Sequence, residues 1–331
     1  MSKKPVILLL LSLIALAGAM LCSLLLGRTA VGWGALKDAF FHYDPGNVEQ
    51  LIVRTERLSR TIIATAAGAA LALAGALMQA LTRNPLAASD VFGINAGAIF
   101  FVVAGVLLFP SSPLLGLAGY AVIGALVSAS VVYGLGSLGR DGLTPVKLIL
   151  AGAAITALFT SFTQGMLVLN ESGFQDVLFW LAGSVSGREL QTALPVLPFI
   201  LAAAFAAVLM GRAVNLLNSG EDIAKGLGQN TLIVKLAIGV LVVVLAGGSV
   251  AIVGAVGFVG LVVPHLARSA AGSDYRWVLP ISAIFGAVLL LLADVAARLA
   301  ISPGEIPIGV MTAVIGVPFF VHAARKGGVW R

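Results

Sequence analysis

The feature that most constrains this chain is a series of long apolar segments separated by short polar intervals. An apolar run of about 20 residues can cross a bilayer as an α-helix, which satisfies its own backbone hydrogen bonds there. Hydrophobic residues make up 60% of the 331 positions and charged residues only 10%, whereas soluble domains carry about a quarter charged residues. The sequence therefore predicts one all-α polytopic membrane domain over residues 1–331.

We predict about ten transmembrane helices from these runs. The first run exceeds the roughly 7 to 15 apolar residues of a cleaved signal peptide, so we expect it to be retained. The eighth is short and interrupted by glycines and Pro264, which indicates irregular backbone covered by protein or lining a cavity. A small apolar piece at 177–182 is too short to cross and is expected at the interface, which suits Trp180. The expected spans are 5–27, 61–81, 92–109, 114–135, 146–169, 193–210, 231–245, 252–267, 278–297 and 306–324.

The second expected span is rich in alanine and glycine. Small residues let helix backbones approach closely in a membrane. Gly68 and Gly75 are therefore predicted to lie at close helix contacts, and Pro85 is predicted to break the helix after its last turn.

The basic residues indicate the orientation of the chain, because lysine and arginine are enriched in cytoplasmic loops. Ten spans place both termini on one side. With the N-terminus in the cytoplasm, 13 of the 20 basic residues fall inside. These are Lys3, Lys4, Arg83, Arg140, Lys147, Arg212, Lys225, Lys235, Arg268, Arg276, Arg325, Lys326 and Arg331. We therefore predict an N-in, C-in topology with residues 219–230 in the cytoplasm.

Residues 219–230 form a short polar interval in an otherwise apolar region. Ser219 can cap a helix N-terminus, with Asp222 in the capping-box position. Gly226 and Gly228 can end that helix. The pattern predicts a helix of about two turns, too short to span a membrane.

Two interpretations of this short helix stay open. Ile223 and Leu227 share one face at i, i+4 spacing. The helix can be a capped turn between two membrane helices, or it can dock a soluble partner. The residues of the interval alone do not decide between them.

Several chemistries are not indicated by the sequence. It contains no G-x-x-x-x-G-K-[ST] phosphate loop, so we expect no nucleotide bound by that motif. The three histidines, His42, His265 and His322, fall on different segments and do not suggest a metal site. The net charge of +6 is not read as nucleic-acid binding, since in a membrane protein the side on which positive charges lie is what matters. We expect no catalytic site and no enzymatic activity in this chain.

One charged pair lies inside an expected span. Asp294 and Arg298 are one helical turn apart near the outer end of the ninth span. Intramembrane charges are a functional hypothesis by default. An intrahelical ion pair that lowers its own insertion cost explains them equally well.

Several stretches together resemble the permeases of bacterial ABC importers for iron-siderophore, haem and cobalamin. The stretches cover essentially the whole chain in the family's order. They are RLSR at 57–60, GAALALAGALMQALTRNPLA at 68–87, GEDIAKGLG at 220–228, GAVGFVGLVVPHLAR at 254–268, ADVAAR at 293–298, EIPIG at 305–309 and GVPF at 316–319. Ser59 departs from the family, which commonly has proline there.

The resemblance implies a ten-helix subunit of the bacterial cytoplasmic (inner) membrane. It implies pairing with a second permease, identical or homologous, and contact with membrane lipid. Two cytoplasmic ABC ATPases would bind ATP and Mg, while this chain binds no cofactor. An extracytoplasmic binding protein would deliver the substrate, and nucleic acid is not an expected partner.

The resemblance also assigns roles to residues. Those matching the family's ATPase-coupling helix are Glu221, Asp222, Ala224, Leu227 and Gly228. Those matching outward basic positions that dock the binding protein are Arg57, Arg60 and Arg298. Without the resemblance, Arg57 and Arg60 would be read as solvated interface anchors. The remaining motif residues, assigned to structure or translocation, are Arg83, Asn84, Pro85, Gly257, Gly260, Pro264, His265, Asp294, Pro307 and Gly309.

The substrate is less constrained than the transporter type. Residues 87–97 and 180–188 look more like the siderophore permeases than the cobalamin ones, which implies ferric-siderophore chelates as substrate. Cobalamin and haem remain alternatives. A secondary transporter or channel that needs no ATPase, or more weakly a structural membrane subunit, is the competing class.

Overall fold

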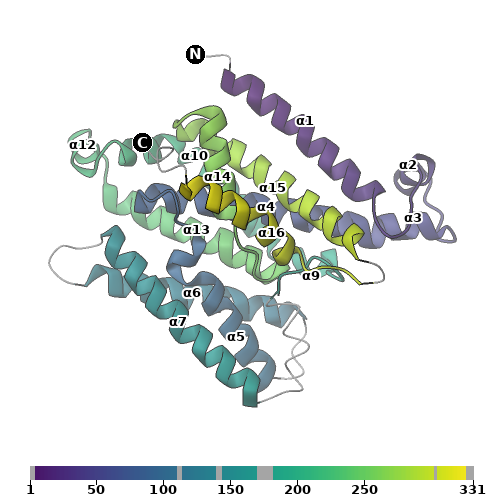
Figure 1. The fold of residues 1–331 in the computed structure, drawn as a ribbon, viewed down its shortest axis with the longest axis horizontal. Helices are drawn as coiled ribbons and strands as arrows, with labels where there is room; N and C mark the ends of the chain where they lie inside the picture. Colours follow the sequence, from purple (N-terminus) through teal and green to yellow (C-terminus); the bar gives the residue numbers. More distant parts are fainter. Residues whose placement is uncertain (1–3, 110–113, 139–143, 170–181, 302–303, 326–331) are drawn as a thin grey trace.

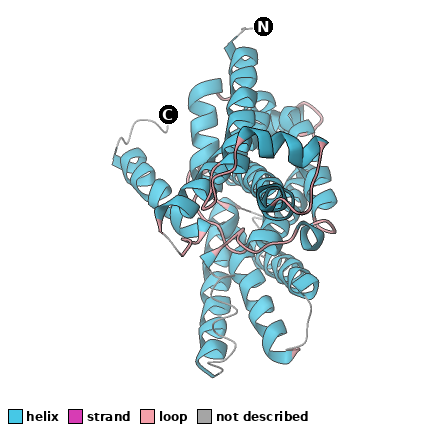
Figure 2. Cartoon of the chain, turned by 90° about the vertical axis from the view of Figure 1, so that its right-hand side faces the viewer, coloured by secondary structure: helices cyan, strands magenta, loops and turns pink. Residues whose placement is uncertain are grey.

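The computed structural model of the chain describes residues 4–109, 114–138, 144–169, 182–301 and 304–325. These residues form helices and loops without a strand (Figure 2), which confirms the predicted all-α class. The helices are α1 (Lys4–Leu25), α2 (Trp33–Phe41), α3 (Val48–Ile52), η1 (Val53–Arg57), α4 (Leu58–Thr82), η2 (Ser89–Phe92), α5 (Ile94–Leu108), α6 (Leu114–Ser137), α7 (Pro145–Leu169), α9 (Leu190–Ala193), α10 (Leu197–Leu209), α11 (Gly211–Asn218), α12 (Glu221–Gly226), α13 (Thr231–Val253), α14 (Val259–Ala271), α15 (Tyr275–Ala300) and α16 (Ile308–Arg325).

Helix α4 lies at the centre of the bundle and packs against α13, α14 and α15. It is buried along almost its whole length, whereas only Ser12, Ala19 and Ser23 are buried in α1. Alanine and glycine dominate its sequence, and small side chains allow the neighbouring backbones to approach it closely. The core of the molecule is therefore built around α4.

Two glycine pairs mark the closest helix contacts of α4. A Cβ atom added to Gly68 would overlap the backbone carbonyl of Gly286 in α15, and one added to Gly75 would overlap Gly260 in α14. The predicted role of Gly68 and Gly75 in close helix approach is thus confirmed. Their partners lie more than 180 residues further along the chain, as the pairing of Gln79 with Gly260 also shows.

Helices α5, α6 and α7 form a second group beneath α4 and α13 in Figure 1. Helix α5 packs against both α6 and α7, and α6 joins the group to α13. Aromatic rings fill the space between α5 and α7, where the Phe100 and Phe159 rings stack with centroids 5.1 Å apart.

Among the described residues, six helical segments are long and apolar enough to cross a membrane: α1, the continuous 35-residue helix Val48–Thr82, α6, α7, α13 and α15. A seventh is added if α10 and α11, bent by 52°, count as one span. Helix α5 and the apolar part of α16 are shorter. The described residues therefore establish several membrane helices, while the count of ten stays a prediction.

Several predicted boundaries are wrong. Helix α13 continues to Val253, beyond the predicted end at residue 245, and the next helix begins at Val259 rather than at residue 252. The break covers residues 254–258 because Gly254 and Phe258 both have positive φ angles, 77° and 67°. Gly260 and Pro264 lie inside α14 instead of interrupting it. The sixth span begins at Leu197, not at residue 193. The interfacial piece around Trp180 lies outside the described residues, apart from Ala182.

The bundle has two distinct ends. Helix α12 lies at one end of the long axis in Figure 1, and α2 and α3 lie at the other. Helix α1 begins, and α16 ends, toward the side on which α12 lies. We refer below to the α12 end and the α2–α3 end.

The glycine contacts of α4 give a first prediction. The substitution Gly75→Ala should lower the free energy of unfolding by about 1–3 kcal/mol, because the added methyl group forces α4 and α14 apart. Gly119→Ala in α6 is the matched control, since a Cβ at Gly119 meets nothing within 4 Å. Thermal unfolding in detergent measures both. Equal midpoints for the two variants would contradict the close-packed account of α4.

Candidate functional site

A cluster of buried charges lies at the α2–α3 end, where α4, α15 and the loop before α16 meet. We call Arg60, Asp294, Arg298 and Glu305 the arginine cluster. The Arg60 guanidinium donates hydrogen bonds to Asp294 Oδ1 at 3.0 Å and to Glu305 Oε2 at 2.9 Å. Arg60 is 2% exposed and Asp294 is 1% exposed. Glu56 Oε1 also accepts from Arg60, at 3.2 Å, from an exposed position. The buried charges of Arg60, Arg298 and Asp294, with the partly buried Glu305, thus compensate one another.

Arg298 ties α15 to the end of α1. Its Nη2 lies 2.7 Å from Asp294 Oδ2, one helical turn away, so the predicted intrahelical ion pair is present. The same guanidinium donates to the backbone carbonyls of Ser23 at 3.2 Å and Leu26 at 3.1 Å. These carbonyls are the unpaired groups that every helix leaves at its C-terminus, and Arg298 satisfies them.

Arg57 also binds the end of α1. It donates to the carbonyls of Leu24, at 2.6 Å, and of Thr29. It is the last residue of η1, a π-helical turn inside the long helix Val48–Thr82. Such a turn changes the direction in which the following side chains point. Arg57 binds the end of α1, and Arg60, three residues later, binds α15.

These contacts bury the three arginines, which the family resemblance places at outward positions, among groups of their own chain. Arg57, Arg60 and Arg298 are 3%, 2% and 5% exposed, and each binds groups of its own chain. The physical reason is that Asp294 and Glu305, which lie far along the sequence, come to Arg60 in the fold. Their predicted role in docking a binding protein stays a prediction.

Glu305 closes the cluster from the loop before α16. Its burial opposes the charged form, but hydrogen bonds from Arg60 and Ser186, and the charge of Arg60, hold the pKa of Glu305 below its usual range. The carboxylate therefore stays ionised at neutral pH. Sequence reasoning gave Glu305 no role, because no pattern in the neighbouring residues links it to Arg60.

The second candidate site is the segment of residues 211–235 at the α12 end. Glu221, the first residue of α12, binds two lysines. Its Oε2 lies 2.6 Å from Lys235 Nζ in α13, and its Oε1 lies 3.3 Å from Lys225 Nζ. The Thr231 hydroxyl donates to the same Oε1 at 3.3 Å. The carboxylate thus bridges α12 and α13.

The lysines set the protonation state of Glu221. The hydrogen bond from Lys235 acts most strongly, and together with Lys225 it lowers the Glu221 pKa from 4.5 to about 2 despite some desolvation. A lowered carboxylate pKa stabilises the folded state above the unfolded pKa, and this contribution is lost as the pH falls toward 2. The ion pair is therefore constant over the physiological pH range.

Three further side chains attach the segment to the core helices. Arg83, at the end of α4, donates to the Leu217 carbonyl at 3.0 Å. Asn215 donates to Asp274 at 2.6 Å and accepts from the backbone N–H of Tyr275 at 2.8 Å, at the start of α15. The Asp274 pKa lies well below its usual range, chiefly through hydrogen bonds from Arg276. The α12 end thus joins α4, α13 and α15.

One face of α12 is free in this chain. Ile223 is 55% exposed and Leu227 is 68% exposed, whereas Ala224 is fully buried. Asp222 is also exposed. Exposed apolar side chains that lie side by side in a short polar segment are typical of a contact surface for a partner.

The predicted capping of α12 is wrong. Ser219 ends α11 and donates from its hydroxyl to the Asn215 carbonyl at 3.2 Å. Helix α12 begins only at Glu221, after Gly220 with φ 129°, and has six residues, which agrees with the predicted length of about two turns. The predicted stop is confirmed, because α12 ends at Gly226 and Gly228 adopts a φ of 83°.

The other motif residues lie at separate helix contacts and turns. Arg83 adopts a left-handed φ of 49° directly after α4, Asn84 accepts from the Leu86 N–H at 2.9 Å, and Pro85 follows, so the predicted break there is confirmed.

The His265 ring in α14 meets the Phe319 ring edge-on at 5.5 Å. Gly309 donates to the Gly183 carbonyl at 3.4 Å, and the Pro307 carbonyl accepts from the N–H of Val310 at 3.0 Å, starting α16. A Cβ added to Gly257 would meet nothing within 4 Å.

Sequence reasoning missed Gln79, a buried polar residue in α4. Its Nε2 donates to the carbonyls of Gly260 and Leu261 at 3.3 and 3.2 Å, and its Oε1 accepts from Arg268 at 2.5 Å. A lone glutamine in an apolar run was the available signal, because such a group must find partners when buried. Gln79 joins α4 to α14 beside the Gly75–Gly260 contact.

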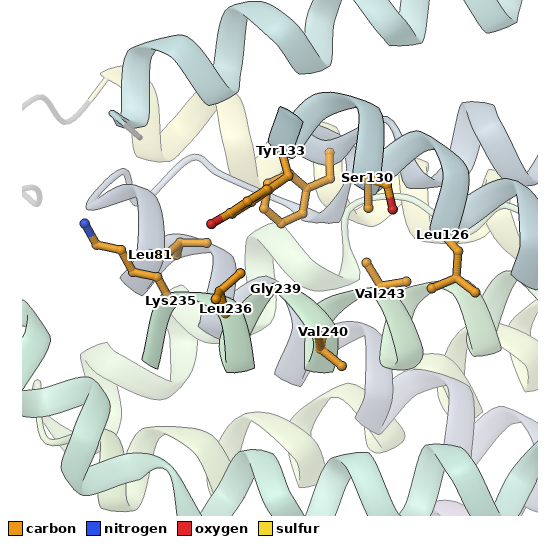
Figure 3. A pocket seen from close by; sticks show the side chains of 11 residues that line it. Leu81, Leu126, Ser130, Tyr133, Lys235, Leu236, Gly239, Val240 and Val243 are labelled. Atoms are coloured by element: carbon orange, nitrogen blue, oxygen red, sulfur yellow. The ribbon is translucent and has the colours of Figure 1, made fainter. Parts of the chain in front are cut away.

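A pocket of about 290 Å³ opens between α6, α13 and the end of α4 (Figure 3). Its walls are mainly apolar, with Tyr133, Ser130 and Lys235 as polar exceptions. Lys235 lies at one end of the row of labelled α13 side chains in Figure 3. Within the described part of the chain, no three His, Cys, Asp or Glu side chains come together as a metal site would require.

Comparison with known proteins places this fold in context. Residues 13–326 match the FecCD transport family. The chain is 49% identical over 326 residues to the probable siderophore transport system permease protein YfiZ of Bacillus subtilis, covering 98% of this chain and 97% of that protein. It is 41% identical over 305 residues to the ferric enterobactin transport system permease protein FepD of Escherichia coli, covering 92% and 90%. A solved structure described as an inward-facing metal-chelate type ABC transporter matches with a TM-score of 0.84 and 28% identity, over 96% of this chain and 98% of that one.

The arginine cluster gives a second prediction. The substitution Arg60→Met should destabilise the chain by about 3–5 kcal/mol, because it removes a cation from the buried Asp294 and the partly buried Glu305. Arg54→Met is the control: Arg54 is exposed and lies over the Tyr43 ring, 4.3 Å from its centroid, a contact worth about 0.5–1 kcal/mol. The unfolding midpoints of the two variants are measured in detergent and compared. If the Arg60 variant is no less stable than the Arg54 variant, the cluster does not hold α4 to α15.

Proposed function

The chain belongs to the FecCD transport family, and from that premise we propose that it is the permease subunit of an ATP-driven, binding-protein-dependent importer for ferric-siderophore chelates. The named relatives support the substrate class, because their names describe them as permeases for siderophore transport and for ferric enterobactin transport. Cobalamin and haem are the alternative cargoes within the same transporter type.

The observation that carries this proposal is the construction of the α12 end. A short helix presents Ile223 and Leu227 to solvent, while polar contacts fasten its surroundings to α4, α13 and α15. A soluble ATPase that pulled or pushed this helix would move the core of the bundle. A secondary transporter or channel would leave this exposed, fastened helix without a partner.

ATP and Mg belong to the separate ATPase subunits in this proposal. Closure of the ATPase pair around nucleotide would displace α12 and tilt the attached helices, which is a rigid-body change of the kind that drives alternating access. A second permease, identical or homologous, would complete the path for the chelate.

The proposed topology has ten spans with both termini in the cytoplasm of a bacterial cell, in its cytoplasmic membrane. Helix α1 begins and α16 ends toward the side of α12 (Figure 1), which fits an even number of crossings. The excess of basic residues on that side supports its cytoplasmic location.

An extracytoplasmic binding protein would dock at the α2–α3 end. Burial of the arginine cluster sets a condition on that docking. A carboxylate of the binding protein that reached Arg60 would compete with Glu305, which now lies 2.9 Å from it, and with Glu56 at 3.2 Å. Docking through Arg57, Arg60 and Arg298 would therefore involve opening this cluster.

The ATPase contact gives a third prediction. The double substitution Ile223→Asp and Leu227→Asp should abolish co-purification of the ATPase and uptake of radio-iron as ferric chelate. Desolvating two carboxylates in an apolar contact is strongly unfavourable. The control for co-purification of the ATPase is Phe40→Asp with Phe41→Asp in α2, at the far end of the bundle, where the side chains are 44% and 75% exposed. Wild-type uptake by the α12 variant, at normal membrane levels, would refute the ATPase contact.

The cargo gives a fourth prediction. A strain that lacks this chain should lose uptake of one class of ferric chelate and keep uptake of labelled cobalamin and haem. Re-expression of the chain should restore uptake of that ferric chelate. Loss of cobalamin or haem uptake instead would keep the importer and replace its substrate.

A further inference from the structure

We propose that Glu221 is a positioning residue, which fixes α12 to α13 through Lys235 and does not itself contact the ATPase. The inference rests on the proposed function and refines the role expected for Glu221 from the family resemblance. In this proposal the exposed side chains of α12 contact the ATPase. The ion pair between Glu221 and Lys235 transmits the movement of α12 to α13.

The geometry separates these two roles. Both Glu221 oxygens are engaged within the chain, with Lys235 at 2.6 Å and Lys225 at 3.3 Å. The Lys235 side chain is 18% exposed, whereas that of Lys225 is 59% exposed. Exposed ion pairs within one helix contribute little. The pair with Lys235 is better shielded and joins two helices, so it is the one that positions α12.

Helix α12 needs such a tie because little else fixes its orientation. It has six residues, fewer than an isolated helix needs for stability in water. Glycines with positive φ flank it, Gly220 at 129° and Gly228 at 83°, and glycine allows more backbone freedom than other residues. The buried Ala224 and the Gln229 side chain, which donates to the Ala213 carbonyl at 3.0 Å, provide the other fixed points.

Lys235 is well placed to pass a movement of α12 into the membrane part of the chain. It lies in the second turn of α13, a helix that packs along α4, α6 and α10. It also lies at the pocket between α6 and α13, where Gly239 leaves open space, since a Cβ there would meet nothing within 4 Å. The first turns of α13 therefore have room to shift when α12 is displaced.

A charge swap tests the inference in the complete complex. The variants are Glu221→Lys, Lys235→Glu and both together, with Lys225→Glu as the control for an exposed partner of the same carboxylate. The complex is reconstituted in liposomes with its ATPase and binding protein. Radio-iron uptake and ATP hydrolysis are measured on the same preparation, which gives ATP consumed per chelate transported.

We expect each single swap to reduce uptake about tenfold and to raise ATP consumed per chelate, because an interaction between contacting charges is lost. The double swap should restore both values to within about threefold of wild type, since it rebuilds the pair with reversed polarity. Lys225→Glu should stay within about twofold. A double swap as defective as the singles, with the ATPase still bound, would overturn the inference and return Glu221 to the ATPase contact.

Neutral variants cover the case in which a swapped chain does not reach the membrane. Glu221→Gln, Lys235→Gln and their combination keep side-chain size and remove the charge. The inference predicts that the two single variants and the double variant lose the same fraction of uptake. A double variant whose loss equals the product of the two single losses would refute it. A failure of the proposed function is recognised separately from a failure of this inference. If α12 does not contact an ATPase, the Ile223 and Leu227 double variant would transport normally, whatever the Glu221 variants do.

Discussion

Close backbone packing along α4 is the constraint on which the rest of the structure depends. Gly68 and Gly75 bring α15 and α14 against α4, and without a hydrophobic drive between helices in lipid such packing is a main source of helix association. Both candidate sites are attached to the two ends of this one helix. Arg60 lies in its first turn, and Arg83, directly after its last turn, binds the α11 backbone. A stiff central helix therefore links the α12 end to the arginine cluster.

The arginine cluster is costly to build in an apolar chain, because each buried charge loses its hydration. It is retained in a form in which two arginines and two carboxylates compensate one another. Arg298 and Arg57 add hydrogen bonds to carbonyls at the end of α1. The cluster thus fastens α1, α4, α15 and the loop before α16 at one end, while the α12 end depends on more exposed pairs such as Glu221–Lys235. The two ends differ in burial, and the less buried end is the one proposed to move.

Sequence patterns predicted what depends on neighbouring residues. The apolar runs gave the helical class, and the glycines of the second span gave its close contacts. The capping of α12 was wrong because Gly220, at φ 129°, separates Ser219 from the helix. The burial of Arg60 was not predictable from neighbouring residues, because its carboxylate partners Asp294 and Glu305 lie 234 and 245 residues further along the chain. Helix boundaries near residues 254–258 failed for a similar reason, since a positive φ at Phe258 is set by the fold.

Site-specific cross-linking between α12 and the ATPase tests the central claim most directly. In a Cys22→Ser background, which removes the single native cysteine, Leu227→Cys and Phe41→Cys are compared in membranes that contain the ATPase subunit. The account predicts a covalent product with the ATPase from position 227, changing in yield when nucleotide is added, and none from position 41. An ATPase product from position 41, or equal absence from both positions in an active complex, would contradict it.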